Sequence, residues 1–155
     1  ISIARKILKI TKKYKVKLII NDDPYIAKIT KADGFHLGQK DGSLFKIKKK
    51  FKNKIVGITC HSSKILAQAA IKNKADYLAF GSFNKSNLKP NAKKANLNIL
   101  KWANKNVKKP IVAIGGINNL NYKKLIRYGA KYIALSSYIW DNPKLKPEDA
   151  IRKFK

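Results

Sequence analysis

The segments KADGFHLG (31–38), KADYLAFG (74–81) and GAKYIALS (129–136) carry one pattern three times along the chain. In each segment an alanine and a charged residue precede a short apolar run that ends at Gly or Ser. Short runs rich in apolar and aromatic residues and bounded by such turn formers are typical of buried strands. The recurrence predicts repeated modules, in which this strand is the second of each module.

Three further apolar runs, each following a Lys-rich turn, open the modules: VKLIIN (16–21), KIVGITC (54–60) and PIVAIGG (110–116). Longer stretches with apolar residues three or four apart separate these strands, which is the spacing of helices. The chain therefore reads as three strand–helix–strand–helix modules. Near-continuous apolar strands that alternate with helices predict a parallel sheet covered by helices.

Two of the helices carry recognisable ends. Ser62-Ser63 is expected to cap KILAQAAIKN (64–73), with Ile65, Leu66, Ala69 and Ala70 on one face. NYKKLIRYGA (121–130) is expected to end at Gly129, the residue type that most often follows the last turn of a helix.

The predicted fold class is α/β, a (β/α)₈ TIM barrel that here lacks roughly the first two strands. A barrel of eight strands needs four modules, and the chain begins with a helical stretch from Ile1 to about Tyr14 that needs a strand before it. We therefore expect residues 1–155 to form a single partial barrel domain whose N-terminal βαβ module lies upstream. An open form of six strands would expose an apolar edge.

The composition is strongly basic, with 36 Lys and Arg against 8 Asp and Glu and a formal charge of +28. Such a charge permits binding to nucleic acid. However, nearly all of it is Lys spread evenly over the chain, so nucleic acid is an unlikely partner. No apolar stretch approaches membrane-spanning length. Cys60 is the only cysteine, which is typical of the reducing cytoplasm.

Active sites of such barrels lie at the carboxyl ends of the strands. The first strand ends at Asn21-Asp22-Asp23 and the second at Gln39-Lys40-Asp41. Because neighbouring strands lie about 4.8 Å apart, Asp22 and Asp41 are predicted to face each other and to bind Mg²⁺. Helix capping is the competing role, and we assign it to Asp23, which precedes Pro24.

The later strand ends indicate phosphate binding. Gly115-Gly116 allows an anion to approach backbone N–H groups, and Ser136-Ser137 adds further donors. The long polar segment 81–94 offers Lys89 as a mobile cation, although a solvated loop is equally typical of such a sequence. His61 is either a functional group or a polar residue at a helix start.

The motifs LIINDD (18–23), ADGFHLGQKD (32–41), GITCHS (57–62), FGSFNKSNLKP (80–90), VAIGGIN (112–118) and GAKYIALSSYI (129–139) together resemble the thiamine-phosphate synthase family. The resemblance runs from Val16 to the end of the chain. It implies a transferase that couples a pyrimidine-methyl diphosphate to a thiazole phosphate and releases diphosphate.

The resemblance also implies roles for individual residues. Asp22 and Asp41 would bind Mg²⁺, and Asn21 and Lys89 would act catalytically on the diphosphate. The remaining implied substrate contacts are Thr59 on the diphosphate, His36 and Gln39 near the pyrimidine, and Ser86, Gly116, Ser136 and Ser137 at the thiazole phosphate.

The chain departs from the family pattern in three respects. Gly81-Ser82 stands where the family has Gly-Pro, and Leu88 replaces a Thr. The family's first module, with Gln, Arg and Lys that hold substrate, is absent, so this chain alone is expected to be poorly active. The other functions considered are a thiazole tautomerase-like barrel, which does not need the two carboxylates, and a basic nucleic-acid-binding module without catalysis.

Overall fold

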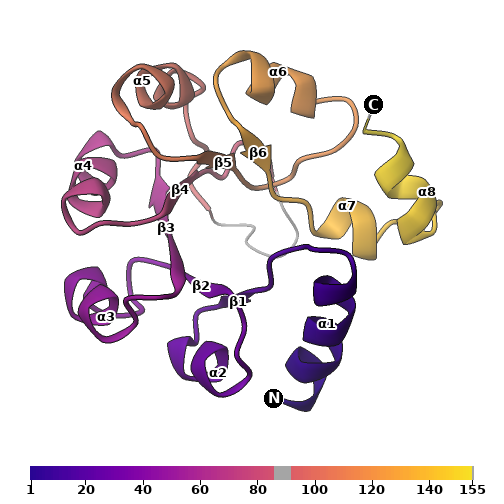
Figure 1. Ribbon diagram of the computed structural model, residues 1–155. Helices are drawn as coiled ribbons and strands as arrows, with labels where there is room; N and C mark the ends of the chain where they lie inside the picture. The colour runs from indigo at the N-terminus through magenta and orange to yellow at the C-terminus, as the bar shows by residue number, and fades with distance from the viewer. Residues whose placement is uncertain (86–91, 155) are drawn as a thin grey trace.

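The computed structural model describes residues 1–85 and 92–154, and within them six strands form one parallel sheet in the order β1-β2-β3-β4-β5-β6 (Figure 1). The six predicted strands are all present; β3 has the predicted length, and the others are shorter, most of all β1, β5 and β6. Their bounds are β1 Ile19–Asn21, β2 Gly34–Leu37, β3 Ile55–His61, β4 Tyr77–Phe80, β5 Ile111–Ala113 and β6 Tyr132–Ile133.

Helices connect the strands and lie around the outside of the sheet in Figure 1. Their bounds are α1 Ser2–Lys13, α2 Pro24–Ile29, α3 Leu44–Lys50, α4 Lys64–Lys72, α5 Asn98–Asn106, α6 Tyr122–Arg127, α7 Ser137–Trp140 and α8 Pro147–Arg152. The predicted parallel α/β architecture is confirmed. The described residues form a six-stranded part of a barrel, and β1 and β6 are its two open edges.

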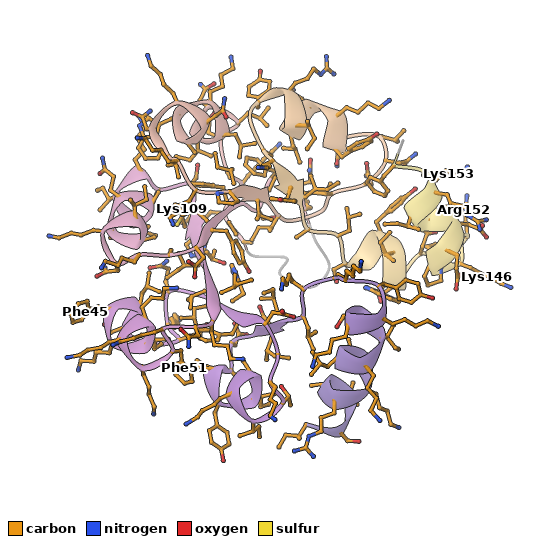
Figure 2. The ribbon with its side chains drawn as sticks, in the orientation of Figure 1. Phe45, Phe51, Lys109, Lys146, Arg152 and Lys153 are labelled. Carbon is orange, nitrogen blue, oxygen red and sulfur yellow. The ribbon has the colours of Figure 1, made fainter. Side chains whose placement is uncertain are left out.

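Alternation along the strands separates a core face from an inner face. Phe35 and Leu37 of β2 are fully buried beneath the helices, whereas His36 between them is only half-buried. Phe51, at the end of α3, packs edge-on against Phe35 with ring centroids 5.4 Å apart (Figure 2). Cys60 of β3 also belongs to the buried core, and burial raises the pKa of its thiol to about 12.

The repeated Ala-Asp pairs have a structural role at the amino end of the sheet. Asp33 accepts hydrogen bonds from Leu18 N at 2.9 Å and from Lys17 Nζ at 3.0 Å. Asp76 accepts a hydrogen bond from Val56 N at 2.8 Å and forms an ion pair with Lys48. Each aspartate thus ties its own strand to the neighbouring strand, with the preceding alanine buried.

The residue before each alanine ends the preceding helix in a left-handed conformation. Lys31, Lys74 and Gly129 have φ values of 60°, 62° and 109°. After α6, Gly129 N bonds to Ile126 O and Ala130 N bonds to Leu125 O, which is the double hydrogen bond of a Schellman ending. The prediction that α6 ends at Gly129 is therefore confirmed.

The start of α4 agrees with the sequence, but its buried face does not. Ser63 Oγ accepts a hydrogen bond from Leu66 N at 3.2 Å, so Ser63 is the cap. Ala67 and Ala70 are buried, whereas Ile65 is 77% exposed. The buried side of α4 is thus offset from the apolar face that includes Ile65 and Ala69, and it shares Ala70 with that face.

The first helix buries little of its apolar surface. Leu8 is buried, but Ile3, Ile7 and Ile10 are 74%, 41% and 58% exposed. In Figure 2, Arg152 of α8 lies at the periphery of the molecule together with Lys146 and Lys153, which flank this helix. Among the described residues, no helix is both long enough and apolar enough to cross a membrane.

Candidate active site

The first strand end separates a capping aspartate from an exposed one. Asp23 Oδ1 accepts a hydrogen bond from Ile26 N at 2.9 Å and caps α2, with Pro24 in the first turn. The capping role predicted for Asp23 is therefore confirmed. Asp22 is exposed, has a φ of 62° and donates its backbone N–H to His36 O at 2.8 Å, so it is tied to β2.

The carboxylates of Asp22 and Asp41 follow neighbouring parallel strands at the same edge of the sheet. Asn21 Nδ2 donates a hydrogen bond to Asp22 Oδ2 at 2.6 Å. Asp41 Oδ2 accepts a hydrogen bond from Gly38 N at 2.6 Å. Both bonds hold a carboxylate at the end of its strand.

The donor set at this edge fits Mg²⁺. In the part of the chain that the structure describes, no three His, Cys, Asp or Glu side chains come together as a metal site. Mg²⁺ commonly uses only one or two protein carboxylates and takes its other ligands from water and substrate phosphates. Two aspartates beside an amide match that pattern, whereas a structural zinc site would need more ligands.

A hydrogen-bonded group of side chains lies on the inner face, next to these carboxylates. His36 Nδ1 lies 2.9 Å from Tyr77 Oη, and His36 Nε2 lies 2.8 Å from Thr59 Oγ1. Gln39 donates a hydrogen bond from Nε2 to Thr59 O. Residues from β2, β3 and β4 are thereby joined, and three of them (His36, Gln39 and Thr59) were singled out from the sequence.

Tyr77 is the member of this group that the sequence reading missed. Its ring stacks on His36 with centroids 5.5 Å apart. Burial raises the pKa of its hydroxyl to about 12. Tyr77 directly follows the Ala-Asp pair of the second repeat, at the position that Gly34 occupies in the first repeat. That difference between repeats, together with Gly57 opposite it on β3, was a usable indication of an inward-facing aromatic ring.

The Gly115-Gly116 pair has a packing role in addition to the predicted phosphate contact. The two residues have φ values of 95° and 58°. A Cβ on Gly115 would lie 2.0 Å from Ser82 Oγ, and one on Gly116 would lie 2.2 Å from Lys85 O. The segment after β4 therefore packs directly on these glycines, and only residues without a Cβ allow that approach.

The last strand end contains a polar atom that lacks a partner. Ser136 is exposed and stands at the N-cap of α7. Ser137 Oγ is buried and, among the described residues, has no hydrogen-bond partner. A buried hydroxyl without a partner is uncommon and calls for an explanation such as an absent ligand.

The remaining candidates are less informative. His61 ends β3 and is exposed, with a φ of 51°. Ser86 and Lys89 lie outside the described residues.

Comparison with known proteins gives a consistent picture. A family model described as thiamine monophosphate synthase matches residues 1–139. A thiamine-phosphate synthase of Pelagibacter ubique is 54% identical over 153 residues, which cover 99% of this chain and 74% of that protein. One from Saccharophagus degradans is 46% identical over 123 residues, covering 79% of this chain but only 57% of that protein.

Solved structures agree with the sequence matches. The thiamine phosphate pyrophosphorylase from Pyrococcus furiosus superposes with a TM-score of 0.90 at 29% identity, covering 99% of this chain and 72% of that chain. A 3-hexulose-6-phosphate synthase superposes with a TM-score of 0.70 at 18% identity and covers 97% of this chain and 78% of that chain, which is a likeness of fold alone. The extent of the family match and the close relatives show that the chain belongs to the thiamine monophosphate synthase family of transferases in thiamine biosynthesis.

Proposed function

We propose that the full-length protein couples hydroxymethylpyrimidine diphosphate to thiazole phosphate and releases diphosphate, forming thiamine phosphate. The observation that carries this proposal is the row of polar residues at the carboxyl ends of three neighbouring strands, with Asn21 and Asp22 after β1, Asp41 after β2 and Thr59 on β3, in a chain of this family. The bond between the pyrimidine methylene carbon and the diphosphate oxygen breaks, and the thiazole nitrogen bonds to that carbon.

At the diphosphate end, Asp22 and Asp41 would hold Mg²⁺, which would supply charge neutralisation for the leaving diphosphate. Asn21 orients the Asp22 carboxylate through its amide, as the 2.6 Å hydrogen bond indicates. Thr59 supplies a hydroxyl at the same edge. Together with Lys89 these groups stabilise the charge that develops as diphosphate departs.

Within the sheet, His36 and Gln39 line the place of the pyrimidine ring. Both are fixed by hydrogen bonds to Thr59, His36 through Nε2 and Gln39 through its side-chain amide. A preorganised wall of this kind holds the two reactants in a productive orientation, which accounts for much of the rate gain when two molecules are joined.

At the other end, Gly116, Ser136, Ser137 and Ser86 bind the thiazole phosphate. The support is the buried Ser137 Oγ, whose missing partner a phosphate oxygen would supply. Gly116 has a left-handed backbone with a φ of 58°, a conformation that occurs in turns whose N–H groups bind anions. In this proposal the diphosphate binds at the carboxyl ends of β1, β2 and β3, and the thiazole phosphate binds at the carboxyl ends of β5 and β6.

The active barrel needs a segment beyond this chain, which spans 74% of the Pelagibacter relative and 57% of the Saccharophagus one. An upstream module of two strands would pair with the open edges at β1 and β6 and complete eight strands. The exposed Ile3, Ile7 and Ile10 of α1 offer apolar surface to such a segment. The chain alone is accordingly expected to have little activity.

The single cysteine and the small polar substrates fit an enzyme of the reducing cytoplasm.

The test is to incubate the purified full-length protein with the two phosphorylated substrates and to measure thiamine phosphate. We expect formation that requires Mg²⁺ and stops with EDTA. Isomerisation of a thiazole phosphate without coupling would instead favour a tautomerase. Salt-sensitive binding of RNA or DNA without any turnover would favour the basic binding module.

A further inference from the structure

The side chain of His36 is held at both ring nitrogens, by Tyr77 on one side and Thr59 on the other. A neutral imidazole donates from one nitrogen and accepts at the other. The direction of the two hydrogen bonds is therefore linked, and one partner must donate to His36 while the other accepts. Which partner donates decides whether the Thr59 proton points into this group or outward.

The chemistry of the two hydroxyls settles the direction. A phenol is a better hydrogen-bond donor and a poorer acceptor than an aliphatic alcohol. The Tyr77 hydroxyl also stays protonated, since burial raises its pKa to about 12. Tyr77 Oη therefore donates to Nδ1, and Nε2–H donates to Thr59 Oγ1. The Thr59 oxygen is then occupied as an acceptor, and its own proton is available to another group.

The geometry points to Tyr77 as a positioning residue that, through His36, turns the Thr59 hydroxyl into a hydrogen-bond donor for an anionic oxygen of the substrate diphosphate. This inference rests on the proposed function, because the diphosphate supplies that oxygen. If the two hydrogen bonds ran in the opposite direction, the Thr59 hydroxyl would donate its proton to His36 Nε2 and would present only lone pairs to an anion. The diphosphate would then bind less tightly, and its bond to the pyrimidine methylene carbon would break more slowly.

The fold gives Tyr77 little freedom to leave this position. Tyr77 and Gly57 are partners in the pairing of β3 with β4, and His36 and Gly57 are partners in the pairing of β2 with β3. A Cβ on Gly57 would lie 1.9 Å from Tyr77 Cζ, so the Tyr77 ring lies directly over the glycine. The ring thus crosses the β3 backbone to reach His36, and a larger residue at 57 would exclude it.

The first test is a double-mutant cycle in the full-length protein. Tyr77→Phe keeps the ring and removes the hydroxyl, and Thr59→Val removes the final donor. We expect Tyr77→Phe to lower kcat/KM for the pyrimidine diphosphate about tenfold in the native background and to have almost no effect in the Thr59→Val background. Equal losses in both backgrounds would show that Tyr77 acts through packing and would overturn the inference.

The matched control is Tyr132→Phe. Tyr132 occupies the same place in the third repeat as Tyr77 in the second, at the start of β6, and is 53% exposed. Tyr132→Phe makes the same chemical change on another strand of the sheet. We expect activity close to that of the native protein. A loss as large as that of Tyr77→Phe would show that the effect is not specific to the hydrogen bonds that join Tyr77, His36 and Thr59.

The second test reads the imidazole directly and does not depend on turnover. Two-bond ¹H–¹⁵N spectra of the full-length protein, labelled at histidine, report which ring nitrogen carries the proton, and His36→Asn assigns the His36 signals. We expect the Nε2–H form in the native protein and a mixture of tautomers in Tyr77→Phe. An Nδ1–H form of His36 in the native protein would overturn the inference that Tyr77 donates to this ring. If the protein makes no thiamine phosphate, the proposed function fails, while these spectra still decide the direction of the hydrogen bonds.

Discussion

The two ends of the sheet use aspartate in different ways. At the amino end, Asp33 and Asp76 each accept a backbone N–H from the neighbouring strand and pair with a lysine. At the carboxyl end, Asp22 accepts a hydrogen bond from Asn21 Nδ2 and Asp41 accepts one from Gly38 N, so each carboxylate is held from within its own strand end. The first pair ties strands together, whereas the second pair stands at the strand ends where we propose the diphosphate binds.

In a chain with 8 acidic residues and 36 basic ones, the contrast separates carboxylates that tie strands together from carboxylates that we propose to bind Mg²⁺. Substituting members of each pair should therefore separate activity from stability.

The largest expected effect is at the carboxyl end. Asp22→Asn or Asp41→Asn in the full-length protein should lower kcat/KM about 10²–10³-fold, the scale of losing one electrostatic contact in a transition state. The melting temperature should hardly change. Asp23→Asn is the matched control, because Asn caps a helix as well as Asp does. Native turnover in the Asp22 and Asp41 variants would refute the metal assignment.

At the amino end the expected loss is in stability. Asp76→Asn removes the charge that accepts from Val56 N and Lys48, and should cost about 1–3 kcal/mol of unfolding free energy. Activity per folded molecule should be retained. Asp149→Asn serves as control, since the Asp149–Arg152 pair is exposed and such pairs contribute about 0–1 kcal/mol. Urea unfolding of the three proteins measures the difference, and equal stabilities would contradict the role in strand tying.

The middle of the sheet offers a third comparison. Gly57→Ala places a methyl group where the Tyr77 ring lies, and overpacking of this kind typically costs about 1–3 kcal/mol. In a Tyr77→Ala background the same substitution should cost much less, because the ring is gone. Thermal unfolding of the four proteins in this cycle gives the coupling, and its absence would show that the ring is free to move away.

The smallest expected effect is a pH dependence at the amino end. The hydrogen bond from Leu18 N, and then Lys17, lower the pKa of Asp33 below its ordinary value of 3.8. A lowered folded-state pKa stabilises the protein above about pH 3.8, and that contribution disappears as the pH falls further through the folded-state value. The stability difference between the native protein and Asp33→Asn should therefore be full at pH 6 and shrink below pH 3.8. A constant difference across that range would count against the cause given for the shift.

Much of the fold, and part of the candidate site, could be predicted from the sequence. The six strands, the cap at Ser63 and the capping role of Asp23 depend on local chemistry within a few residues, and such signals survive in a single chain. The repeated segments also predicted parallel strands in successive modules, and in the sheet consecutive strands lie side by side.

The features that were missed depend on contacts between distant residues. Which side of α4 is buried depends on how the helix lies on the sheet, and Ala67 and Ala70 are buried while Ile65 is exposed. Tyr77 acquires its role from Gly57 and His36, which lie on other strands. The packing of segment 82–85 on Gly115 and Gly116 was hidden for the same reason, because an anion site and a close chain crossing both favour glycine.

The burial of Cys60 has a practical consequence for measuring motion in the centre of the sheet. Its thiol lies in the buried core on β3, which pairs with strands on both sides, and its raised pKa of about 12 leaves almost no reactive thiolate at neutral pH. Alkylation of this residue therefore requires β3 to open. The rate at which a thiol reagent labels Cys60 would report the free energy of that opening, with and without substrates bound at the strand ends.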